Sequence, residues 1–306
     1  MSNQGRREEL VGATPLPRIG PLAVAGRALG GVPPSAQVLA GIVSVQIGAA
    51  LAKQLFATVG SSGSVALRIF FAAVVLLVMW RPSLRMSRRA WAVVASYGMV
   101  LGAMNLLFYL ALARLPLGVA VTITFLGPLA VAIGGSRRWL DGLWALLAGA
   151  GVVLLAEGGN GDLHLVGILL ALGAAACWAS YILLSAALGR HTTDGGGLAL
   201  GMVLAALVVV PVGLAEAGAD LFAPWVLVAG FGVALLSSVI PYSLELEALR
   251  RMPARVFGVL MSLEPAVAAL VGLLLLGEVL EPTQWLAVLM VVGASVGATR
   301  TASPEP

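Results

Sequence analysis

Charged side chains are scarce in this sequence. Only 10% of its 306 residues are Asp, Glu, Lys or Arg, whereas 60% are hydrophobic. Soluble globular domains carry about 25% charged residues. The composition therefore excludes a soluble globular domain and indicates a polytopic, multi-pass membrane protein in a lipid bilayer.

Cysteine and histidine are also nearly absent. The single cysteine, Cys177, lies inside an apolar stretch, which excludes a disulfide framework and a cysteine-based metal cluster. The two histidines, His164 and His191, lie in or beside predicted loops without other metal-ligand residues nearby. We therefore expect no metal site and no bound cofactor.

Long apolar runs fill most of the chain. About ten segments approach the roughly 20 residues that a membrane-spanning helix needs. The runs are continuously apolar rather than alternating, which excludes the strands of a β-barrel. The sequence thus predicts an all-α membrane protein with helices near 37–57, 63–80, 91–113, 117–135, 139–157, 163–186, 196–215, 224–245, 256–276 and 283–299.

The arginines predict the orientation. The pI near 9.8 suggests nucleic acid, but the basic residues lie in short gaps between apolar runs and are topology signals instead. With the N-terminus in the cytoplasm, the outside loops hold only Arg114. This bias places both termini in the cytoplasm. The inside segments contain Arg6, Arg7, Arg18, Arg27, Arg81, Arg85, Arg88, Arg89, Arg137, Arg138, Arg190, Arg250, Arg251, Arg255 and Arg300.

Matched stretches in the two halves of the sequence predict a duplicated helical unit. Residues 114–132 (RLPLGVAVTITFLGPLAVA) align without a gap on residues 251–269 (RMPARVFGVLMSLEPAVAA), and Pro128 falls on Pro265. We predict a first five-helix repeat at 36–157 and a second at 163–300, after a disordered cytoplasmic tail at 1–35.

An odd number of helices per repeat inserts the second copy in the opposite sense. Inverted repeats with proline-interrupted helices at corresponding positions are typical of alternating-access transporters. Pro128 and Pro265 are therefore predicted hinges. The alternative is that proline is simply frequent in membrane helices.

Several stretches resemble the EamA branch of the drug/metabolite transporter superfamily, and most of all the bacterial threonine/homoserine exporters of the Rht type. The resemblance implies export of small amino acids across the bacterial inner membrane, driven by protons as in an antiporter. Where relatives can carry an acid before the Gly-Pro of helix four, this chain has Thr124. The similar stretches are SVQIGAALAKQLF (44–56), GAMNLLFYLALARLPLGVAV (102–121), FLGPLAVAIGGSRR (125–138), IPYSLELEALRRMP (240–253) and FGVLMSLEPAVAALVGLLLLGE (257–278).

Polar side chains inside spans are expensive and mark functional positions. Gln46 and Lys53 share a face of helix one. Lys53 and Arg68 lie at similar depths, roughly 6 and 8 Å below the outer surface. We predict that this group binds the substrate, with the two cations facing its carboxylate. Alternatively, both cations extend to the outer surface.

Four further polar or aromatic residues are predicted to contact substrate. Asn105 and Tyr109 form one stripe on helix three, or else an interhelical hydrogen bond. Trp178 and Tyr181 lie in the inner half of helix six, where an interface belt or core is the alternative. Glu245, near the end of helix eight, is predicted to form an inner gate, or else an ion pair with the adjacent arginine-rich loop.

Glu264 is the most unusual residue. It lies roughly 12 Å from the cytoplasmic end of helix nine, too deep to reach water along the helix. Pro265 follows it and frees the backbone carbonyl of Met261. We predict that Glu264 couples transport to protons or binds the substrate amine. The alternative is a structural carboxyl bonded to a neighbouring helix, for example to Asn105 or Tyr109.

Other protein classes fit less well. An embedded enzyme needs a nucleophile–base pair or a metal cluster, and the sequence contains no such constellation. A channel more often has a selectivity element repeated over several subunits. A purely structural protein does not explain the buried charges. A superfamily transporter for another amino acid, a nucleobase or a drug remains the second interpretation.

Overall fold

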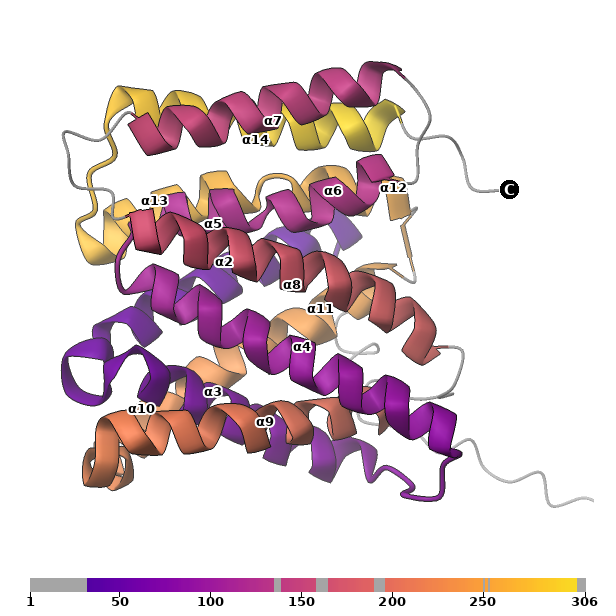
Figure 1. The fold of residues 1–306 in the computed structure, drawn as a ribbon, viewed down its shortest axis with the longest axis vertical. Helices are drawn as coiled ribbons and strands as arrows, with labels where there is room; N and C mark the ends of the chain where they lie inside the picture. Colours follow the sequence, from indigo (N-terminus) through magenta and orange to yellow (C-terminus); the bar gives the residue numbers. More distant parts are fainter. Residues whose placement is uncertain are drawn as a thin grey trace, which may run out of the picture.

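The chain folds into a bundle of helices (Figure 1). The computed structural model describes residues 32–134, 139–157, 165–189, 196–249, 251–252 and 254–301. Within those ranges there is no β-strand. The helices are α2 (Pro34–Gln54), α3 (Phe56–Trp80), α4 (Arg88–Leu112), α5 (Leu117–Thr124), α6 (Leu126–Gly134), α7 (Trp139–Glu157), α8 (Leu165–Gly189), α9 (Gly196–Ala217), η1 (Gly218–Phe222), α10 (Pro224–Ala234), η2 (Leu235–Val239), α11 (Ile240–Leu249), α12 (Ala254–Met261), α13 (Glu264–Leu276) and α14 (Pro282–Thr301).

The prediction of an all-α membrane protein is confirmed. Among the described residues, nine helical segments are long and apolar enough to span a membrane, and α7 contributes the shorter apolar stretch Gly142–Leu155. Together they form the predicted set of about ten helices. Residues 1–31 of the predicted tail, His164 and His191 lie outside the described residues.

The two halves of the chain interleave. In Figure 1, α7 and α14 lie side by side at one edge of the bundle, and α3 and α9 lie at the opposite edge. Between these pairs, α4 packs on α8, and α11 packs on α2. Every one of these four pairs joins a helix from the first half to a helix from the second. Burial of apolar side chains along the pairs holds the halves together.

Three predicted spans are not continuous helices. The fourth span breaks at Phe125, between α5 and α6, and the ninth breaks at Ser262 and Leu263, between α12 and α13. Phe125 aligns with Ser262 in the duplicated stretch, so both breaks lie just before a matched proline. The eighth span contains one π-helical turn, η2, between α10 and α11.

The predicted limits of the first two spans, which left residues 58–62 as a gap, are wrong. Residues 58–62 belong to α3, which bends at Gly60 with a φ of 67°. A positive φ is accessible to glycine at little cost. Beyond the bend, Glu216 of α9 accepts a hydrogen bond from the Ser62 backbone N–H at 3.0 Å. This carboxylate satisfies a donor that the bend leaves unpaired, so the helix resumes at once.

Candidate functional site

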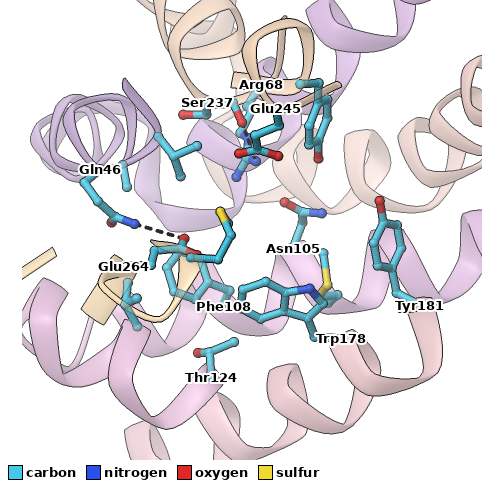
Figure 2. A pocket seen from close by; sticks show the side chains of 16 residues that line it. Gln46, Arg68, Asn105, Phe108, Thr124, Trp178, Tyr181, Ser237, Glu245 and Glu264 are labelled. Atoms are coloured by element: carbon cyan, nitrogen blue, oxygen red, sulfur yellow. Dashed lines mark hydrogen bonds between the residues drawn. The ribbon is translucent and has the colours of Figure 1, made fainter. Parts of the chain in front are cut away.

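A cavity of about 290 Å³ lies in the middle of the bundle. Its walls come from both halves of the chain, including α2, α3, α4, α8, α11 and α13 (Figure 2). Most of the lining side chains are apolar or aromatic, and a few polar groups converge on the space. Of the residues predicted from sequence, the cavity is lined by Gln46, Arg68, Asn105, Trp178, Tyr181, Glu245 and Glu264.

Glu264 begins α13 at one side of the cavity. Its Oε1 accepts a hydrogen bond of 3.1 Å from Nε2 of Gln46, on α2, and both side chains are buried. This bond replaces the partners Asn105 and Tyr109 that the structural alternative named. Glu264 Oε2 and Gln46 Oε1 are buried acceptors without a partner among the described groups.

The break at Ser262 and Leu263 explains how Glu264 reaches this position. Because Pro265 lies in the first turn of α13, its missing N–H costs no hydrogen bond there. Glu264 consequently stands at a helix N-terminus, where the helix dipole favours an anion, yet it is only 8% exposed. Burial disfavours the charged form of this carboxyl group and the helix dipole favours it, so the two effects act in opposite directions.

Arg68 of α3 lies across the cavity from Glu264 (Figure 2). Its Nη2 donates to the backbone carbonyl of Ser237 at 3.2 Å, and its guanidinium carbon lies 5.7 Å from the ring centroid of Tyr109. Its Nε is buried without a partner, and the described residues supply no carboxylate that pairs with it. This leaves a positioned guanidinium available for an anion.

The Ser237 carbonyl, which accepts the hydrogen bond from Arg68, has no intrahelical partner because of Pro241, just after η2. Pro241 has no N–H to offer the carbonyl four residues earlier, which is that of Ser237. The π-turn also frees the carbonyl of Leu236, which accepts a hydrogen bond from Ser44 Oγ of α2 at 2.8 Å. The sequence LLSSVIP carried this signal, since a proline inside an apolar span frees a carbonyl, but the prediction did not include Ser237.

Two predicted substrate ligands lie away from the cavity. Lys53 Nζ pairs with Glu278 Oε1 at 2.6 Å and donates to the Leu115 carbonyl at 2.7 Å. Glu278 Oε2 also accepts from the Leu117 N–H at 2.6 Å, which ties α2, α5 and the α13–α14 connection together. Tyr109 is fully buried beneath the Arg68 guanidinium, so it positions that group and does not line the cavity.

The aromatic residues of α8 form another wall. The Trp178 ring contacts Phe125 edge-on at 5.8 Å, and Tyr181 lies 5.1 Å from Tyr97, measured between ring centroids. Gly127, which aligns with Glu264, packs on the same helix. A Cβ at Gly127 would lie 2.3 Å from the carbonyl oxygen of Ala175. The first half therefore has no room for a side chain at the position where the second half has its acid.

The remaining predicted positions are placed as follows. Glu245 of α11 lines the cavity, and its gate role stays a prediction. Pro128 lies in α6 and Pro265 in α13, each just after a helix break. Within the described ranges no group of three or more His, Cys, Asp or Glu could hold a metal ion.

A cavity between two interleaved sets of membrane-length helices, with the ionisable side chains Arg68, Glu245 and Glu264 in its wall, is typical of a membrane transporter. The profile of the EamA-like transporter family matches residues 165–300. The threonine/homoserine exporter RhtA of Escherichia coli K12 is 44% identical over 271 residues, covering 88% of this chain and 92% of its own. The chain belongs to the EamA-like transporter family.

Other comparisons agree with this assignment. RhtA of Salmonella typhimurium SL1344 is also 44% identical, with 88% of this chain and 92% of its own covered. The uncharacterized transporter YwfM of Bacillus subtilis is 28% identical, covering 76% of this chain and 82% of its own. One solved crystal structure, 20% identical, covers 88% of this chain and 98% of its own with a TM-score of 0.58, which shows a shared fold.

Proposed function

We propose that the protein exports small amino acids such as threonine and homoserine from the bacterial cytoplasm across the inner membrane. The observation that carries this proposal is that Arg68 and Glu264, which can carry opposite charges, line one cavity without forming an ion pair with each other. Arg68 offers a guanidinium to a carboxylate, and Glu264 with Gln46 offers two acceptors to an ammonium group. An amino-acid zwitterion satisfies both ends at once.

The size of the cavity is compatible with the same cargo. Sites for drug-sized ligands occupy about 300–1,000 Å³, and this cavity of about 290 Å³ lies at the lower end of that range. A small amino acid fits in a cavity of this size. The printed names of the relatives that are 44% identical support threonine and homoserine as the first substrates to test.

Alternating access between two inverted repeats is the mechanism that we propose. The matched breaks before Pro128 and Pro265 support it, because a broken helix bends at lower cost than a continuous one. The helix pairs α3–α9, α4–α8, α2–α11 and α7–α14 support it as well, since each joins the two halves. One half can then rock against the other around the cavity.

Glu264 is proposed as the coupling group. A carboxylate that binds the substrate ammonium cannot hold a proton at the same time, so the two ligands compete for it. Inward flow of protons then drives outward flow of substrate, which is antiport. The first half supplies no acid at the matching position, because Gly127, which aligns with Glu264, has no space for a side chain.

The test of the proposed function is transport by purified protein in liposomes. We expect radiolabelled threonine and homoserine to accumulate when a pH difference is imposed, and unlabelled threonine to compete. A panel of nucleobases, aromatic amino acids and cationic drugs should compete weakly. Efficient competition by a nucleobase or drug, with no threonine transport, would favour the second interpretation of the family resemblance.

The orientation is a separate prediction. In a Cys177→Ser background, an impermeant thiol reagent added to whole cells is expected to label Val279→Cys, between α13 and α14. It should not label Ser83→Cys, between α3 and α4, until the membrane is permeabilised. Both positions are exposed, so accessibility depends on the side of the membrane alone. The reverse pattern would overturn the placement of both termini in the cytoplasm.

Lys53 is expected to close the outer end of the protein and not to bind substrate. Lys53→Met and Glu278→Gln should each increase external labelling of a cysteine introduced at Met104, inside the cavity. An exchanged pair, Lys53→Glu with Glu278→Lys, should restore part of the protection. If Lys53→Met weakens threonine binding and leaves labelling unchanged, Lys53 acts on the substrate instead.

A further inference from the structure

Asn105 presents a fixed hydrogen-bond acceptor to the cavity. Its Nδ2 donates to the Leu101 carbonyl, one turn earlier on α4, at 2.9 Å. A carbonyl can only accept, so this bond fixes which end of the amide carries the nitrogen. The oxygen Oδ1 is left at the other end, in the cavity wall (Figure 2). None of the described groups donates to it.

Two other polar side chains of the wall already donate a hydrogen bond or face a neighbouring helix. The Thr124 hydroxyl already donates to the Ala120 carbonyl at 2.6 Å. Ser237 Oγ faces α2, where a Cβ at Gly48 would lie 2.2 Å from it. Arg68 and Glu264 are the groups for the two charged ends of a zwitterion, and the Glu245 carboxyl group and the Tyr181 and Tyr242 hydroxyls also line the cavity. Asn105 Oδ1 differs from these groups because it is a neutral oxygen that can only accept, and the bond to the Leu101 carbonyl fixes its position.

Part of the wall next to Asn105 is apolar, although Tyr181 also lies beside it. Met104 and Phe108 neighbour it on α4, and Trp178 faces it from α8. A substrate hydroxyl that turned toward these side chains would lose its hydrogen bonds to water without compensation. Conversely, a substrate without a hydroxyl would leave Asn105 Oδ1 buried and unpaired.

We propose that Asn105 determines specificity by accepting a hydrogen bond from the side-chain hydroxyl of a hydroxy amino acid. This inference rests on the proposed export of amino acids and names the feature that selects among them. It predicts that threonine is preferred to valine, in which a methyl group replaces the hydroxyl. Homoserine is likewise preferred to norvaline. One hydrogen bond of ordinary strength corresponds to a preference of about tenfold.

The experiment compares threonine and valine as competitors of radiolabelled threonine exchange in liposomes. Wild-type protein is expected to prefer threonine by about tenfold. Asn105→Leu, which keeps the volume and removes the amide, should reduce this ratio to near one by weakening threonine and not valine. Ser180→Ala is the control, because Ser180 lies exposed on α8 and does not line the cavity, and its ratio should stay at the wild-type value.

The outcomes separate the two proposals. If wild-type protein exchanges neither threonine nor valine, the proposed function fails. If it exchanges both without preference, or if Asn105→Leu weakens both equally, the role of Asn105 is overturned. Retained valine exchange shows that the variant is folded. Should the leucine variant fail to fold, Asn105→Ala gives the same comparison with the same expected loss of preference.

Discussion

Glu264→Gln is expected to abolish accumulation of threonine against its gradient. Glutamine keeps the shape of the side chain and can still bond to Gln46, so insertion and folding should be preserved. The variant loses the charge that faces the substrate ammonium. Removing one member of a buried charge pair costs roughly 2–5 kcal/mol, which is a loss of about 30-fold or more in apparent affinity for threonine.

The loss of coupling between threonine transport and protons is the more specific part of this prediction. Residual threonine movement in Glu264→Gln should be insensitive to an imposed pH difference, since the amide cannot exchange a proton. Glu281→Gln, beyond the C-terminal end of α13, is the matched control and should behave as wild type. A Glu264→Gln protein that still accumulates threonine under an imposed pH difference would rule out coupling through this residue.

Arg68→Met is expected to have an effect of similar size on amino acids with a free carboxylate. The guanidinium is positioned by the Ser237 carbonyl and the Tyr109 ring. Loss of this group should cost about 2–5 kcal/mol of threonine binding. Arg68→Lys should recover only part of the binding, because a lysine cannot reproduce the planar fork of donors.

A threonine analogue without the carboxylate makes this test specific. The decarboxylated amine should bind weakly to wild-type protein and equally weakly to Arg68→Met. Arg114→Met is the control, since Arg114 lies exposed just after the C-terminal end of α4, where it donates to the Leu110 carbonyl. Normal threonine binding by Arg68→Met would show that the guanidinium does not bind the substrate carboxylate.

Glu264 can be singled out from the sequence because a carboxyl group and a proline stand together inside an apolar span. The number of spans can be predicted as well, since hydropathy depends on composition alone. The breaks at Phe125 and Ser262 were harder to predict. A proline predicts a weak point in a helix, but the packing of neighbouring helices determines where the chain bends.

Lys53 and Arg68 illustrate what depth alone cannot resolve. The two cations lie at similar depths, and the sequence gives no preference between them. Their partners are distant in the chain: Lys53 pairs with Glu278, 225 residues away, and Arg68 bonds to Ser237, 169 residues away. Only the folded structure shows that Lys53 pairs with Glu278 and that Arg68 lines the cavity.

The central claim is that a proton and a substrate ammonium compete for Glu264. Calorimetry of threonine binding to purified protein, in buffers with different heats of ionisation, measures this competition directly. Binding should release a proton, and the apparent affinity should fall as the pH is lowered through the range in which Glu264 becomes protonated. Threonine binding that releases no proton and keeps one affinity over the whole pH series would contradict the claim.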